Sequence, residues 1–220
     1  MAEQNLLAAA AAENRMSMLA LMGEAEAASF DGQAYAKTLP GIRDNAEFFD
    51  PLRFCSQRGV TEGKIKFYRE VELKHGRVGM LAALGIVVGE SYHPLFGGDI
   101  DVPAYLAFQQ TPLQAFWPAV VLAIAIPEIY SVLSFEPVPG GKAWSIRSDH
   151  DSGNLGFDPL DLKPTDPDEL KQMQTDELTY GRWGMLATAG MILQEVVTHD
   201  KLLPMLSVSG QEFDAKIFLI

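Results

Sequence analysis

Three apolar stretches alternate with polar connections along this chain, and they predict helices at about residues 66–91, 113–135 and 176–198. In the first stretch, the uncharged run Val78–Gly89 follows a group of charged residues, and the third stretch repeats this arrangement before Trp183–Leu193. The middle stretch contains Pro118, Pro127 and one acid, Glu128. Each stretch is too long for a strand, so the pattern predicts an all-α fold.

The same stretches are candidates for crossing a membrane. A transmembrane helix needs about 20 mostly apolar residues, and the uncharged runs are shorter than that. They reach the required length only if the preceding charged residues enter the membrane too, where each charge needs a partner. Prolines in the middle stretch are tolerated in a membrane helix when neighbours satisfy the freed backbone groups. We therefore predict an all-α membrane protein with three transmembrane helices.

An internal repeat relates the first and third stretches. The segment Glu72–Ala82 (ELKHGRVGMLA) returns as Glu177–Ala187 (ELTYGRWGMLA), with eight of eleven positions identical. A second echo precedes each copy, as FDPL at 49–52 and again at 157–160. The repeating unit is therefore a loop motif followed by a helix.

The charges of the repeat suggest how its two copies meet. Glu72 and Arg77 are five residues apart, about 140° around a helix axis, and cannot pair well with each other. Pairing Glu72 with Arg182, and Glu177 with Arg77, solves this if the two helices cross about a local twofold axis. Small residues at i, i+4, i+7 and i+11 from each glutamate favour such a close crossing; they are Gly76, Gly79, Ala83, Gly181, Gly184 and Thr188.

Composition agrees with a small membrane protein that has long polar connections. The chain has 220 residues, of which 48% are hydrophobic and 21% charged, with a net charge of −12 and a mean hydropathy of +0.04. The acidic balance argues against nucleic-acid binding, because no basic surface is available for phosphates. Cys55 is the single cysteine, which excludes a disulfide within the chain.

The polar segments have distinct expected roles. Residues 1–47 are expected to form an N-terminal extension and 204–220 a tail. His93-Pro94 should stop the first helix, 94–113 should be a loop with one short turn, and 136–175 a polar loop. Basic residues crowd the start of the first helix and are absent between the first two. The positive-inside bias then places the N-terminus on the cytoplasm-equivalent side and the C-terminus opposite.

The motif allows several kinds of chemistry. Paired acids with a histidine could serve as general acid and base, but no nucleophile triad, phosphate loop or metal cage accompanies them, so an enzyme is disfavoured. An inverted-repeat transporter is disfavoured because three spans leave no second gate. The better interpretation is axial ligation of a magnesium tetrapyrrole. Magnesium prefers oxygen donors, and a glutamate neutralised by an arginine is a nearly neutral oxygen donor. Neutral imidazole, as in His75, can also serve.

The repeated E-x-x-[H/N]-x-R motif, with GFDPL ahead of its second copy, resembles the three-helix chlorophyll-binding light-harvesting antenna proteins. The resemblance covers about residues 48–203. The connection HPLFGGDIDVPAYLAFQQTPLQAFW is similar to that of the membrane-intrinsic peridinin–chlorophyll a/c proteins of dinoflagellates and the related fucoxanthin–chlorophyll a/c proteins. It implies a chlorophyll a/c-binding thylakoid antenna that passes energy to a photosystem and is not an enzyme.

The resemblance also implies roles for particular residues. Chlorophyll ligands would be Glu72 and His75 on the first helix, Glu128 on the second, and Glu177 and Gln194 on the third. Arg77 and Arg182 would complete the interhelical ion pairs and touch the same pigments. The two FDPL segments would shape the ends of two carotenoid sites, for pigments of the peridinin or fucoxanthin type and the diadinoxanthin type. Partners would be the photosystem core, neighbouring antenna subunits and thylakoid lipid, with a stromal N-terminus and a lumenal C-terminus.

Some positions depart from the family pattern or allow a structural interpretation. Tyr180 stands where the family has Asn, His or Gln, and a phenol is a poor axial ligand. His199 lies too close to the third helix to match the family's C-terminal histidine. The ion pairs could be purely structural, His75 a core residue, Gln194 a packing amide and Glu128 a polar helix-end residue. A photoprotective relative, which dissipates energy on the same scaffold, is the competing function.

Overall fold

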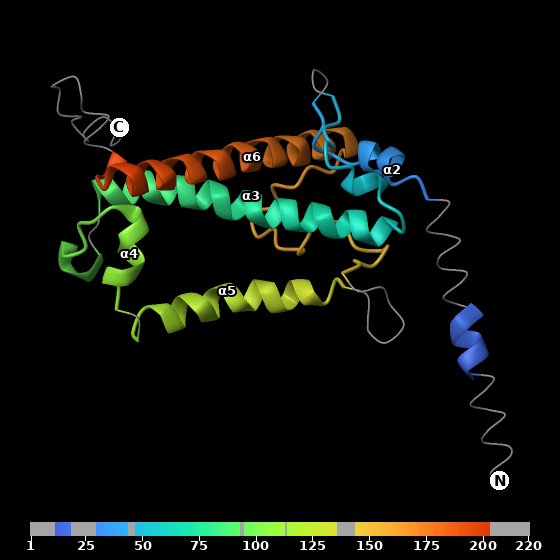
Figure 1. The fold of residues 1–220 in the computed structure, drawn as a ribbon, viewed down its shortest axis with the longest axis horizontal. Helices are drawn as coiled ribbons and strands as arrows, with labels where there is room; N and C mark the ends of the chain where they lie inside the picture. The colour runs from blue at the N-terminus through green and yellow to red at the C-terminus, as the bar shows by residue number, and fades with distance from the viewer. Residues whose placement is uncertain are drawn as a thin grey trace, which may run out of the picture. The chain divides into compact units, whose positions relative to one another are not determined.

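The computed structural model describes residues 12–18, 30–43, 47–92, 95–112, 114–135 and 144–202. In this part of the chain all regular secondary structure is helical, apart from one isolated bridge, Phe135 to Ile146, and this confirms the all-α prediction. The predicted stop at His93-Pro94 and the tail at 204–220 lie outside the described residues. The helices are α2 (Gly32–Thr38), η1 (Phe54–Ser56), α3 (Glu62–Ser91), η2 (Leu95–Gly98), α4 (Ala104–Gln110), α5 (Trp117–Val132) and α6 (Pro167–Thr198) (Figure 1).

The three long helices differ from their predicted bounds at their starts. Helix α6 begins at Pro167 rather than at 176, because Asp166 caps it by accepting the Asp168 N–H, and proline suits the first helical position. The predicted polar loop is correspondingly shorter. Helix α3 begins at Glu62 rather than 66, and α5 covers Trp117–Val132 rather than 113–135.

The segment predicted as a loop between the first two long helices contains more structure than expected. It forms η2 and then α4, a helix of seven residues that follows Pro103. As for the predicted spans, no helix in the described ranges combines the length and the apolar character needed to cross a membrane.

The chain divides into two compact units, and each is described by itself. The first unit comprises residues 1–70 and 134–154. Its core packs Ala36 of α2 against Val60 and Ile65. Tyr35 donates a hydrogen bond to Glu62, and burial together with this carboxylate raises the pKa of Tyr35 to about 12. Part of the predicted N-terminal extension therefore packs onto the start of α3.

The second unit comprises residues 71–133 and 155–220. In it α6 runs alongside the greater part of α3, while α5 lies on the other side of α3 in this view (Figure 1). Helix α4 packs against α6. Tyr105 at the start of α4 donates its backbone N–H to Glu195, and its hydroxyl lies 3.2 Å from Nδ1 of His199. Lys201 forms an ion pair with Asp101 just before α4. This unit contains every residue that the sequence proposed as a ligand.

Candidate functional site

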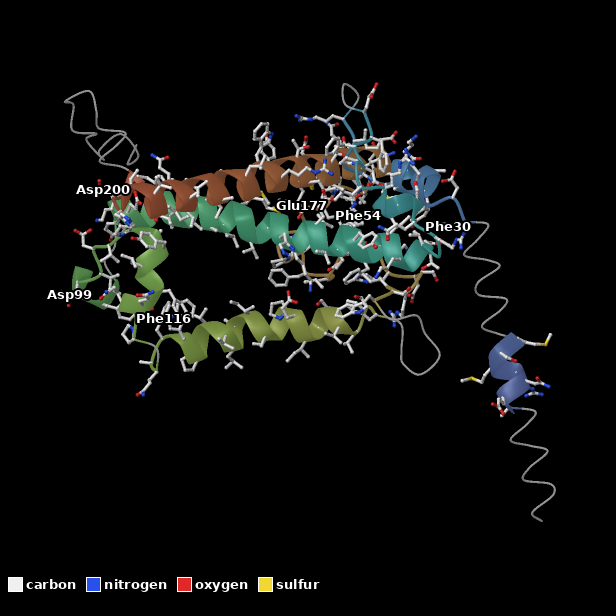
Figure 2. The ribbon with its side chains drawn as sticks, viewed as in Figure 1. Phe30, Phe54, Asp99, Phe116, Glu177 and Asp200 are labelled. Atoms are coloured by element: carbon white, nitrogen blue, oxygen red, sulfur yellow. The ribbon has the colours of Figure 1, made fainter. Side chains whose placement is uncertain are left out.

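Two crossed ion pairs join α3 and α6, as the sequence predicted. Nε and Nη2 of Arg182 each lie 2.8 Å from Oε1 of Glu72. Nε of Arg77 lies 2.7 Å from Oε1 of Glu177, which Figure 2 labels where α6 runs beside α3. Each carboxylate is neutralised by its arginine. Both glutamate side chains are 31% exposed, so they are also accessible. The predicted pairing is confirmed.

The closest approach of the two backbones occurs at two glycines. A Cβ atom added to Gly76 would lie 3.0 Å from Cα of Gly181, and one added to Gly181 would lie 3.0 Å from Cα of Gly76. Both residues are buried. Larger side chains would force the helices apart, and the ion pairs on either side depend on this short separation.

A second set of contacts between α3 and α6 is reciprocal, because each helix makes the same contact with the other. A Cβ on Gly79 would lie 2.8 Å from the backbone nitrogen of Met185, and one on Gly184 would lie 2.7 Å from that of Met80. Such reciprocity is what a local twofold axis requires. One contact breaks it, because the Thr188 hydroxyl donates to the Gly79 carbonyl at 2.9 Å and the matching residue of α3 is an alanine.

His75 has the tautomer that a ligand needs. Its Nδ1 lies 2.8 Å from the Val71 carbonyl oxygen one turn earlier, so Nδ1 carries the proton and donates it. The lone pair of Nε2 is then available to an electrophile outside the helix. The residue is exposed, which argues against the alternative of a core histidine.

Glu128 on α5 is neutralised by a residue that the sequence analysis gave no chemical role. Nζ of Lys74 lies 2.7 Å from Oε2 of Glu128 and 2.7 Å from Oγ of Ser131. The glutamate side chain is 53% exposed and that of Lys74 29% exposed. One signal was present in the sequence, since α5 holds a single acid and α3 a lysine next to His75.

The remaining predicted residues lie apart from the ion pairs. Gln194 is exposed on α6, 17 residues and therefore about 25 Å along the helix from Glu177. Tyr180, at the position equivalent to His75, is 63% exposed. The structure does not bring Gln194 to the crossing, and its role stays a prediction.

The two FDPL segments form the same turn in both places. Asp50 accepts the backbone N–H groups of Phe54 and Cys55. Asp158 accepts the backbone N–H groups of the residues four and five positions later in the chain. These hydrogen bonds lower the pKa of its carboxyl group. The preceding residues, Phe49 and Phe157, are 87% and 85% exposed. The turn thus holds a phenylalanine outward, where it can contact an apolar ligand.

The sequence analysis missed a third pair of acids that occupy equivalent positions in the two copies of the repeat. Glu90 and Glu195 each lie eighteen residues after the repeat glutamate, at equivalent positions of α3 and α6. Glu195 is fully buried, and Glu90 accepts the Leu202 backbone N–H. Extending the repeat comparison beyond Ala187 would have found this pair.

An apolar cavity lies beside these acids. Its volume is about 510 Å³, and small residues such as Ala82, Gly85, Gly89 and Ala107 line much of it. The unit thus combines neutralised carboxylates, an imidazole donor and open apolar space, which suits large hydrophobic ligands that carry a metal.

Comparisons with known proteins agree with this interpretation. A family model described as "Chlorophyll A-B binding protein" matches residues 33–196 and 147–214. Light-harvesting complex stress-related protein 1, chloroplastic, from Chlamydomonas reinhardtii is 45% identical over 181 residues, which cover 78% of this chain and 70% of the relative. Its stress-related protein 3.1 is 44% identical over 185 residues, 81% of this chain and 70% of the relative. A fucoxanthin-chlorophyll a-c binding protein from Isochrysis galbana is 40% identical over 172 residues, 76% and 80% of the two chains.

Proposed function

Because this chain belongs to the chlorophyll A-B binding protein family, we propose that its crossed helices bind chlorophylls and carotenoids as a light-harvesting antenna protein. The observation that carries the proposal is the matched pair of neutralised carboxylates, Glu72 with Arg182 and Glu177 with Arg77. A bound chlorophyll would supply the absorbing ring and a magnesium ion that takes a further donor from the protein. Glu72 and Glu177 would provide oxygen donors for that ion without adding net charge.

Further ligands follow from the same reasoning. His75 offers a free Nε2 lone pair, and Glu128 offers a carboxylate that Lys74 neutralises. Gln194, which is exposed on α6, is proposed as a ligand from the family resemblance alone. Arg77 and Arg182 hold the glutamates in place and line the same pigment sites. No chlorophyll is proposed on Tyr180.

The carotenoid and chlorophyll types are proposed from the relatives. The names of the fucoxanthin–chlorophyll a-c binding relatives favour chlorophyll a with chlorophyll c and a carotenoid of the fucoxanthin type. A carotenoid of the peridinin type in its place, and one of the diadinoxanthin type beside it, are proposed from the family resemblance alone. The outward Phe49 and Phe157 of the two FDPL turns would contact the carotenoid ends.

We place the protein in the chloroplast thylakoid membrane. Helices α3, α5 and α6 would cross it, with the N-terminus stromal and the C-terminus lumenal, as the distribution of basic residues favours. The charges of Glu72, Glu128 and Glu177 inside these spans would be tolerated because each is paired with a basic residue. Partners would be a photosystem core, neighbouring antenna subunits and thylakoid lipid. No chemical reaction is proposed.

Reconstitution tests the proposal. The purified chain is refolded in detergent with chlorophyll a, chlorophyll c and carotenoids, and the complex is separated from free pigment. A defined pigment-to-protein ratio, with visible circular dichroism from coupled chlorophylls, is expected. A chain that binds no pigment would overturn the proposed function.

The fate of the absorbed energy has a second candidate. Relatives at 44–45% identity carry stress-related names, and this favours a photoprotective protein that dissipates energy over one that delivers it. The chlorophyll fluorescence lifetime of the reconstituted complex decides between them. A lifetime several-fold shorter than that of a harvesting antenna measured in the same detergent supports dissipation, and an equal lifetime supports delivery.

A further inference from the structure

Lys74 is the cation of α3 that faces α5 rather than α6. Its ammonium group lies 2.7 Å from Oε2 of Glu128 and 2.7 Å from Oγ of Ser131, one helical turn further along α5. Ser131 in turn donates to the Glu128 carbonyl oxygen at 2.8 Å. The three groups form one hydrogen-bonded cluster that joins the two helices.

The cluster uses only one oxygen of the carboxylate. Lys74 occupies Oε2, and within the described residues no hydrogen bond engages Oε1 of Glu128. Because the side chain is 53% exposed, Oε1 is open to a ligand approaching from outside the helix pair. The Lys74 side chain is more enclosed than that of Glu128, at 29% exposed.

Glu128 is neutralised by a basic residue, as the other two carboxylates are, but that basic residue comes from a different part of the fold. At the crossing, each glutamate is paired with an arginine from the opposite copy of the repeat. Helix α5 belongs to no repeat and contains no basic residue between Trp117 and Val132, so it cannot supply the countercharge for its own acid. Lys74 supplies that charge from α3.

We infer that Lys74 is a positioning residue for a pigment on α5, since it neutralises Glu128 and fixes the orientation of its carboxylate, so that Oε1 can ligate a chlorophyll magnesium. This inference rests on the proposed function. An unpaired carboxylate would be costly in lipid and would add a net negative charge to the ligand. With Lys74 in place, Glu128 is a nearly neutral oxygen donor, and the ion pair joins α5 to α3 one residue before His75.

Charge and hydrogen bonding can be separated by substitution. Lys74→Gln keeps a polar side chain that can donate to Glu128 and Ser131 but removes the charge, and it should lose about one chlorophyll per protein on reconstitution. Glu128→Leu should lose the same chlorophyll and give the same difference spectrum. Lys74→Arg should retain the full complement. Lys74→Gln combined with Glu128→Gln should recover the chlorophyll, because an amide oxygen is a neutral donor that needs no countercharge.

The outcomes distinguish this inference from its premise. A wild-type chain that binds no pigment rejects the proposed function itself. If the wild type binds pigment and Lys74→Gln binds as much, the inference is wrong. If the double variant recovers nothing beyond Lys74→Gln, the lysine acts as a mechanical link and the charge argument fails. Lys171→Gln, which changes an exposed lysine of α6, is the matched control and should leave the chlorophyll count unchanged.

Discussion

The two copies of the repeat, on α3 and on α6, have the same backbone contacts and different chemistry. Their glutamates, arginines and glycines make reciprocal contacts that agree to within about 0.1 Å. Three residues after the glutamate, however, α3 has His75 with a free imidazole nitrogen, while α6 has the exposed phenol of Tyr180. Apart from the hydrogen bond from Thr188 to Gly79, symmetry is therefore kept where the helices touch each other and is relaxed where they face outward.

The strongest test of this comparison is a large side chain at the crossing. Gly181→Leu should abolish assembly, because the new atoms would meet the backbone of α3 at Gly76; overpacking costs about 1–3 kcal/mol and more when only backbone is available to move. Gly76→Leu should have an equal effect. The yield of pigmented complex is the measurement. Gly190→Leu is the control, since a Cβ there meets nothing within 4 Å. Unequal effects of the two crossing variants would contradict the twofold relation.

Charge substitution at the crossing should have the next largest effect. Arg182→Leu removes the guanidinium group that lies against Glu72, and a carboxylate that has lost its countercharge is costly inside a membrane. The chlorophyll on Glu72 should be lost with it. Exchanging the charges, as Glu72→Arg with Arg182→Glu, should restore folding more fully than the visible circular dichroism, because the ligand has moved to the other helix. A double variant no better than the single one would show that the two residues are not energetic partners.

The outward positions should affect single pigments rather than assembly. His75→Leu removes the free imidazole nitrogen and should reduce the bound chlorophyll by about one per protein, while the complex still forms with the remaining pigments. Pigment extraction and quantification per protein provide the measurement. An unchanged ratio would remove His75 from the ligand set.

The smallest effect is expected at Tyr180. Tyr180→Phe should leave the chlorophyll content unchanged, because an exposed phenol is a poor axial donor. Tyr180→His should instead add about one chlorophyll, since it would copy the His75 position onto α6. Loss of a whole chlorophyll in Tyr180→Phe would show that the tyrosine takes part in binding.

Sequence reasoning succeeded where the repeat provided a constraint. The partner of Glu72 could be named because Arg77 is on the wrong side of its own helix and a second copy existed. Lys74 and Glu128 had no such constraint, because α5 has no counterpart in the repeat and their pairing depends on how α5 packs.

Errors at the helix starts have local causes. The polar composition of the residues after Asp166 predicts a loop, but the aspartate followed by Pro167 is a helix-capping sequence and starts α6 there. Helix α4 was missed because its seven residues lack a clear period, and contacts from far along the chain hold it in place.

The anchoring of α4 has a consequence for the order of biosynthesis. A helix of seven residues is too short to be stable alone in water. Its contacts come from Glu195 and His199, which are 90 and 94 residues after Tyr105. At translation rates of about 5–20 residues per second, the ribosome needs roughly 5–20 s to supply these anchors. During that interval α4 and the apolar cavity beside it are unfinished, so the walls of the cavity are complete only after the end of α6 has been made.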